Sequence, residues 1–76
     1  MMRHLPLAEE TWVHRRQADE SGVPKIVQCG PLGSMIRWAA QQPGQEQQRY
    51  TFSIRTVEGF RSWHEIQAAA HAAQLI

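Results

Sequence analysis

The C-terminal end of the chain shows the clearest pattern, that of an amphipathic helix. Apolar and small residues recur there at steps of three and four positions, which places them along one helical face. Ser62 and Glu65 have the spacing of a capping box, in which each side chain bonds the backbone N–H of the other residue at the start of a helix. We therefore predict a helix that begins at Trp63 and packs on the core. Its predicted core face comprises Ile66, Ala69, Ala70, Ala73 and Ile76.

Residues 49–56 alternate between apolar and polar side chains, which is typical of a strand. Such alternation indicates an antiparallel sheet with one face covered and the other face in solvent. We expect the C-terminal helix to provide the cover. The apolar side of this strand comprises Tyr50, Phe52 and Ile54, and the polar side comprises Arg49, Thr51, Ser53 and Arg55.

Residues 34–40 fit either a strand or a short helix. As a strand, they pair with residues 49–56 through a Pro-Gly turn, and Arg37 then lies on the open face of the sheet. As a helix over residues 34–42, they end at the same Pro-Gly pair, and the two alanines before it favour the helical state. We favour the strand, because the turn lies midway between two alternating segments.

The N-terminal third carries a shorter strand signal at residues 25–29, which Gly and Pro residues bound on both sides. Before it, the chain forms either a partner strand over residues 11–17 or a helix over residues 6–18, and we favour the strand. The length of 76 residues suffices for one small core. These elements predict a single compact α+β domain over residues 1–76, with a small antiparallel sheet of about three strands covered on one face by the C-terminal helix.

The formal net charge is only +1, so the average field around the molecule cannot steer a polyanion strongly. Acidic residues nevertheless gather near the start of the chain, and the basic stretch that follows is interrupted only by Glu46. A basic surface can therefore form locally. The acidic group comprises Glu9, Glu10, Asp19 and Glu20, and the basic stretch contains Lys25, Arg37, Arg49 and Arg55.

The candidate chemistry of the chain is sparse. Cys29 is the only cysteine, so it cannot form an internal disulfide, and we expect a cytoplasmic protein. No apolar run approaches the ~18 residues of a membrane span, and we predict neither secretion nor membrane anchoring.

His64 and His71 lie seven positions apart, too far for the usual metal-binding pair, so we predict no metal and no cofactor. Cys29 with His14 as its base could form a small enzyme, but we favour packing as the role of this cysteine and predict no catalytic residues.

The predicted open face of the sheet carries the strongest functional signal. If residues 34–40 form a strand, Arg37 converges there with Arg49 and Arg55, and Thr51 lies between the last two. Sheets of two or three strands can enter the major groove of DNA, where arginines reach phosphates or guanine edges. The sequence therefore predicts a binding site at Arg37, Arg49, Thr51 and Arg55.

The same elements resemble the arm-type N-terminal DNA-binding domains of tyrosine integrases. The similar stretch comprises residues 33–38, the Pro-Gly turn, residues 49–56 and a helix with Trp63 in its first turn, a little over half of the chain. The resemblance implies a three-stranded sheet followed by one helix, with DNA contacts from the three arginines of the sheet. It also implies an accessory protein of a mobile element rather than a recombinase.

Three functional hypotheses follow. The first is a non-enzymatic module that binds duplex DNA through the arginine-bearing face, and the second is an inhibitor or adaptor that binds another protein through the same face. The third, which we favour least, is the Cys/His enzyme. The edge strands of so small a sheet also permit a homodimer.

Overall fold

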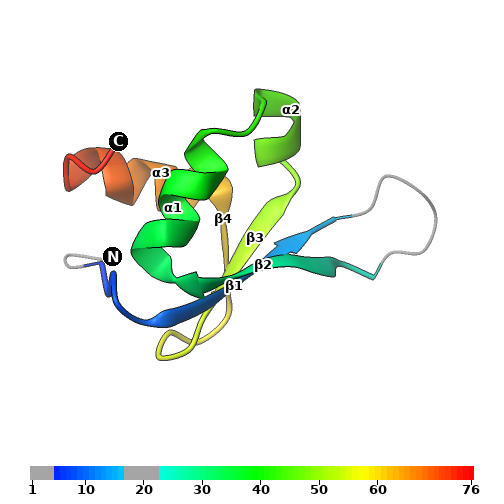
Figure 1. Cartoon of the computed structure of the whole chain (residues 1–76), viewed down its shortest axis with the longest axis horizontal. Helices are drawn as coiled ribbons and strands as arrows, with labels where there is room; N and C mark the ends of the chain where they lie inside the picture. Colours follow the sequence, from blue (N-terminus) through cyan, green and yellow to red (C-terminus); the bar gives the residue numbers. More distant parts are fainter. Residues whose placement is uncertain (1–4, 17–22) are drawn as a thin grey trace.

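The computed structural model describes residues 5–16 and 23–76, which form an α+β fold (Figure 1). Neighbouring strands of the sheet are antiparallel, in the order β2-β1-β3-β4. The predicted fold class is confirmed, although the sheet has four strands rather than about three. In chain order the elements are β1 (Glu10–Arg15), β2 (Lys25–Pro31), α1 (Leu32–Ala40), α2 (Gly44–Gln47), β3 (Tyr50–Ile54), β4 (Phe60–Ser62) and α3 (Trp63–Ala72).

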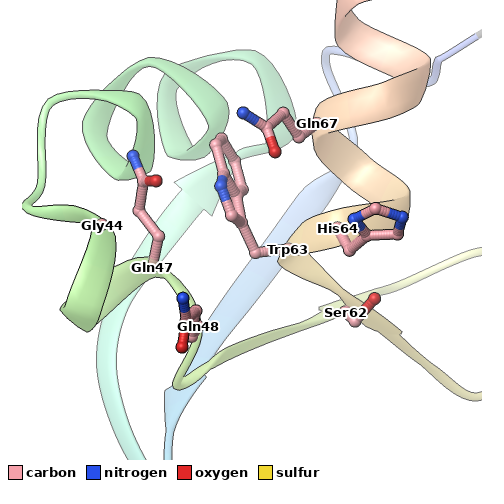
Figure 2. Close-up of a pocket in the computed structure, with 7 residues that line it drawn as sticks. All are labelled: Gly44, Gln47, Gln48, Ser62, Trp63, His64 and Gln67. Carbon is pink, nitrogen blue, oxygen red and sulfur yellow. The ribbon is translucent and has the colours of Figure 1, made fainter.

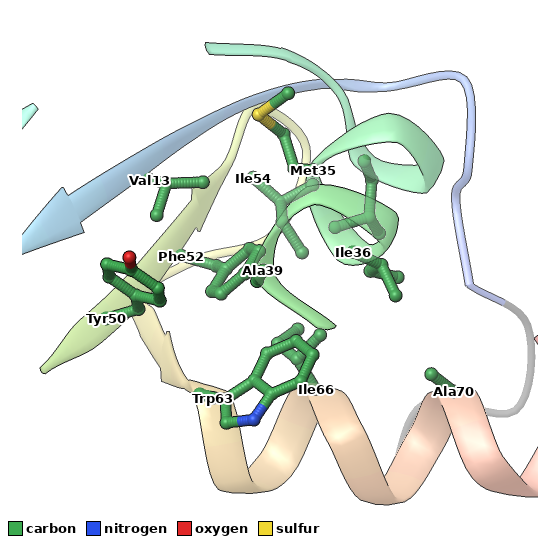
Figure 3. Packing of buried hydrophobic residues seen from close by; sticks show 11 residues of the cluster. Val13, Met35, Ile36, Ala39, Tyr50, Phe52, Ile54, Trp63, Ile66 and Ala70 are labelled. Carbon is green, nitrogen blue, oxygen red and sulfur yellow. The ribbon is translucent and has the colours of Figure 1, made fainter. Parts of the chain in front are cut away.

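Helices α1 and α3 cover the same face of the sheet. Helix α1 contacts β1 and β2, α3 contacts β3 and β4, and the two helices also contact each other. Figure 3 shows their side chains meeting those of the strands, where the ring of Phe52 stacks on that of Trp63 with 5.9 Å between centroids. Burial of this cluster is the main stabilising contribution to the fold. The cluster comprises Val13, Leu32, Met35, Ile36, Ala39, Tyr50, Phe52, Ile54, Trp63, Ile66 and Ala70.

The prediction of a strand at residues 34–40 is wrong, because Leu32–Ala40 forms helix α1. The place beside β3 that this segment was expected to fill is taken by β1. Arg37 is exposed on α1, so the expected convergence of this arginine with those of the sheet does not occur. The physical reason is that apolar residues recur in this segment at helical spacing, and α1 buries them on the side that faces the sheet. These residues are Leu32, Met35, Ile36 and Ala39.

The two predicted N-terminal strands are confirmed within the described residues, and Gln17, the predicted end of the first, lies outside them. Strand β1 occupies residues 10–15, which excludes the alternative helix there, and it pairs antiparallel with β2. The register of this pair shifts between Val13 and His14, as at a β-bulge. Strand β4 was not predicted, and its three residues pair with β3 and lead directly into α3. Asp19 and Glu20, counted above among the acidic residues, lie outside the described residues.

Both ends of α3 carry a capping motif. At the start, the backbone N–H of Glu65 donates to Ser62 Oγ at 3.2 Å, and the backbone N–H of Ser62 donates to Glu65 Oε1 at 3.4 Å, which confirms the predicted capping box. At the end, Gln74 has a φ of 61°, and the N–H groups of Gln74 and Leu75 donate to carbonyls of the last turn, as in a Schellman motif. The helix therefore stops at Ala72, before the end of the apolar pattern.

Replacing Ser62 by alanine should lower the free energy of unfolding by about 0.5–2 kcal/mol, because a backbone N–H at the helix start loses its side-chain acceptor. Urea unfolding of the two proteins measures this difference. Ser34→Ala is the matched control, since Ser34 is exposed within α1, where alanine favours the helix. An unchanged midpoint and slope for Ser62→Ala would show that the capping box contributes no stability.

Candidate functional site

The sheet face opposite α1 and α3 is the first candidate site. Residues directly opposite one another in antiparallel strands project from the same face, so the pairing register identifies its side chains. Trp12 lies between Cys29 and Ser53, and Ser53 in turn lies opposite Phe60. The next row runs from Ile26 through His14 to Thr51. We call this surface the open face, and it comprises Glu10, Trp12, His14, Ile26, Cys29, Thr51, Ser53, Phe60 and Ser62.

The centre of the open face is aromatic. The rings of His14 on β1 and Phe60 on β4 meet edge to face across β3, with 5.2 Å between their centroids and an interplanar angle of 72°. They can meet because the β3 side chains between them, Thr51 and Ser53, are small. Phe60 is nevertheless 63% exposed, so most of its ring is available to a ligand.

Arginines flank the open face at both ends of β3. At one end, the backbone N–H of Arg16 donates to Arg49 O at 2.8 Å, and Arg49 Nη1 donates to Arg16 O at 3.5 Å. At the other end, the backbone N–H of Arg55 donates to Glu10 O at 3.0 Å. Arg49 and Arg55 lie six positions apart along one extended segment, which corresponds to roughly 20 Å. Two cationic groups therefore stand on either side of the aromatic centre, and the acidic residue Glu10 lies opposite Arg55.

The structure places three of the four predicted site residues in line along and beside β3, with the two arginines at opposite ends. Arg49, Thr51 and Arg55 follow the alternation of β3 on the open face and at its ends. Arg37 does not join them, because α1 lies over the opposite face. The aromatic residues of the open face were missed, although the strand predicted at residues 11–17 implied by alternation that Trp12 lies opposite the core.

An ion pair links β1 to the helical layer. Arg15 Nε and Nη2 donate to Glu46 Oε1 at 2.6 Å and Oε2 at 3.1 Å, a bidentate contact between β1 and α2. Hydrogen bonding from Arg15 lowers the pKa of Glu46; desolvation opposes this shift, and the charges of Arg15 and Arg49 lower the pKa further. The same hydrogen bonding raises the pKa of Arg15. The one acidic residue in the predicted basic stretch is thus already bound within the protein.

Replacing Glu46 by glutamine should remove stability that depends on pH. The pKa of Glu46 is lower in the folded protein, so its contribution is complete above the pKa of the unfolded chain and is lost as the pH falls through the folded value. The difference between the urea midpoints of wild type and Glu46→Gln should therefore be largest at neutral pH and shrink in acid. A double-mutant cycle with Arg15→Gln provides the control. Purely additive effects of the two substitutions at neutral pH would contradict an energetic contribution from this pair.

A cleft between α2 and the start of α3 is the second candidate site (Figure 2). Its volume is about 360 Å³. The indole of Trp63 is buried in its wall, and Nε1 has no hydrogen-bond partner among the described residues. Gln47 Nε2 donates to the carbonyls of Ala39 and Ala40 at 3.0 and 3.4 Å, so part of the lining caps the end of α1. The lining comprises Gly44, Gln47, Gln48, Ser62, Trp63, His64 and Gln67.

This cleft offers hydrogen bonds but little catalytic chemistry. Its side chains are uncharged amides, a hydroxyl, an indole and the imidazole of His64. A buried indole N–H without a partner is unfavourable, so water or another small acceptor would be stabilised beside Trp63. The cleft contains no carboxylate, thiol or ammonium group that could act with His64 as an acid, base or nucleophile.

Cys29 and His14, the two groups of the alternative Cys/His enzyme, both lie on the open face. Cys29 on β2 is exposed and lies opposite Trp12, whereas His14 lies opposite Ile26 and its ring contacts Phe60. Within residues 5–16 and 23–76, no three His, Cys, Asp or Glu side chains are grouped so as to hold a metal ion. None of the helices described is long and apolar enough to cross a membrane.

Comparisons of the chain with protein-family models, curated proteins and solved structures give no match. The open face and the cleft beside Trp63 are therefore the features from which a function can be inferred. Of the two, the open face combines the exposed ring of Phe60 with flanking arginines, whereas the cleft offers amides, a hydroxyl, an indole and an imidazole.

Proposed function

We propose that this chain is a non-catalytic binding module that holds nucleic acid against its open face. The observation that carries the proposal is the aromatic centre formed by the exposed Phe60 and the half-buried His14, which lies between Arg49 and Arg55 at the ends of β3. Arginine side chains donate to phosphate oxygens, and aromatic rings stack on bases. Thr51 adds a hydroxyl that can donate or accept a hydrogen bond at the middle of the face.

The charge near Arg49 supports an anionic ligand despite the net charge of +1. Arg15, Arg16 and Arg49 come together at this end of the sheet. Glu46 lies beside them, and its carboxylate is bound by Arg15. Cationic groups therefore exceed anionic groups here among the described residues. Such a local excess attracts a polyanion at short range, where salt does not fully screen it.

A protein partner is the second candidate, because Phe60 and Ile26 are 63% and 55% exposed on the same face. Exposed apolar side chains with arginine at their rim are also typical of protein interfaces. The two candidates differ in salt dependence. Phosphate contacts release counterions, so the affinity for nucleic acid falls steeply as salt rises, whereas burial of apolar area does not.

Replacing Arg49 and Arg55 together by glutamine should weaken nucleic-acid binding. The slope of log affinity against log salt concentration should fall by about 0.7–0.9 for each arginine–phosphate interaction that the substitutions remove. Fluorescence anisotropy of labelled oligonucleotides over a salt series measures both effects. The thermal midpoint should stay close to that of wild type, since both arginines lie at the surface of the sheet.

The matched control is Arg37→Gln, which removes one arginine from the opposite layer of the protein. It should leave both the affinity and the salt slope nearly unchanged. A wild-type protein that binds neither single-stranded nor duplex oligonucleotides at low salt would refute the proposal, because electrostatic attraction is strongest there. The protein partner would then become the leading candidate.

A further inference from the structure

We infer, on the basis of the function proposed above, that the ligand of the open face is a single-stranded segment of nucleic acid rather than a duplex. Three features of the open face favour a single strand as the ligand. They are the width of the sheet, the exposure of its aromatic side chains and the spacing of its arginines.

The sheet is too wide to enter a duplex with its open face. Four strands about 4.8 Å apart span roughly 14 Å between the outer strand axes, whereas the major groove is about 12 Å wide and admits a helix or a two-stranded ribbon. The exposed apolar side chains reach across this whole width, from Ile26 on edge strand β2 to Phe60 on edge strand β4. A duplex would therefore touch the face mainly through its outer phosphates and leave these side chains without apolar contacts.

The rings of the open face match unpaired bases instead. In a duplex the faces of the bases are covered by their neighbours, whereas a single strand can place its bases flat on aromatic side chains. Phe60 is 63% exposed, and its ring contacts that of His14 across β3. Trp12 lies in the same cross-strand row as Phe60, with only the small Ser53 between them. Trp12 is half-buried, so the face offers one exposed ring and one partly exposed indole as stacking positions.

The spacing of the arginines suits a short strand. Arg49 and Arg55 lie roughly 20 Å apart along β3, with the rings between them. About six stacked nucleotides at 3.4 Å each span this distance, or about half as many in an extended strand. One phosphate can therefore contact each arginine while the intervening bases lie over Phe60 and Trp12.

The test is the affinity of the full chain for three labelled probes of equal length at low salt: oligothymidine, oligouridine and a DNA duplex. We expect at least one single strand to bind about tenfold or more tightly than the duplex. Comparison of the two single strands shows whether the 2′-hydroxyl matters. If the duplex binds as tightly as both single strands or more tightly, the inference is overturned, although nucleic-acid binding itself stands. If none of the probes binds, the proposed function fails as well.

Variants of Phe60 test the stacking contact itself. Phe60→Leu keeps an apolar side chain but removes the ring. It should weaken single-strand binding by about 5- to 150-fold, the usual effect of losing one aromatic side chain on which a base stacks. Phe60→Tyr keeps the ring and should bind like wild type. Ile76→Ala is the control for removal of an exposed apolar side chain elsewhere. Equal affinities of Phe60→Leu and wild type, with unchanged thermal midpoints, would exclude stacking on this ring.

Trp12 provides a second readout. Binding of oligothymidine should quench its fluorescence, because a stacked base contacts the indole directly, whereas Trp63 is buried in the core and Trp38 lies on α1, over the other face of the sheet. In the variant Trp12→Phe most of this quenching should disappear while binding persists. Unchanged quenching in that variant would place the bases away from β1 and contradict the proposed path of the strand.

Discussion

Replacing Phe52 by alanine should lower the free energy of unfolding by about 3–5 kcal/mol. Phe52 is fully buried at the middle of β3 and stacks on Trp63 of α3 with 5.9 Å between ring centroids. Its removal leaves a cavity at the contact between the sheet and this helix, which neighbouring side chains can fill only in part. Urea unfolding at constant pH measures the decrease in stability.

Ser53→Ala is the control for this substitution, because Ser53 is the next residue of β3 and faces the open side. Its effect on stability should lie within about 0.5 kcal/mol of wild type. The contrast tests the register of β3, since a shift of one residue exchanges the covered and open faces. Equal decreases for the two variants would contradict the register and remove the basis for a binding surface at Thr51.

Replacing Leu32 by alanine should cost about 2–5 kcal/mol. Leu32 is fully buried at the start of α1, and alanine keeps the helical propensity of the position high. The decrease in stability therefore reports on packing of α1 against the sheet and not on helix formation. Arg37→Ala, on the exposed side of the same helix, should be nearly neutral and serves as the control. A Leu32→Ala protein as stable as wild type would mean that α1 does not pack as described.

The elements that sequence patterns predicted correctly are those whose pattern lies in one uninterrupted segment. β3 combines clean alternation with aromatic and β-branched residues, and α3 begins at a capping box. Helix α1 was misread because its apolar positions start at Leu32, between Pro31 and Gly33, two residue types that usually interrupt regular structure. In the structure Pro31 is the N-cap residue of α1 and Gly33 already belongs to its first turn. Proline and glycine, which usually interrupt helices and strands, thus mark the start of a helix at this point of the chain.

The binding surface was predictable only in part, for a similar reason. Arg49, Thr51 and Arg55 followed from the alternation of one strand, whereas Phe60 belongs to a strand of three residues that is too short to show a period. The pairing of Arg15 with Glu46 joins residues 31 positions apart and has no local sequence signal. Which strand lies beside β3 was equally hidden, since β1 comes from the far end of the sequence.

The position of β1 at the centre of the sheet has a consequence for how the chain folds. Thr11 pairs with Ile54 and Arg15 with Tyr50, so joining the two central strands closes a loop of roughly 40 residues that contains β2, α1 and α2. Such non-local pairing slows folding, because the entropy of closure is lost before the contacts form. A nascent chain that has emerged only as far as α2 holds β1 and β2 without the strand that completes their sheet. We therefore expect productive folding to wait for β3 to leave the ribosome and then to proceed as one cooperative step, with no shorter N-terminal fragment stable by itself.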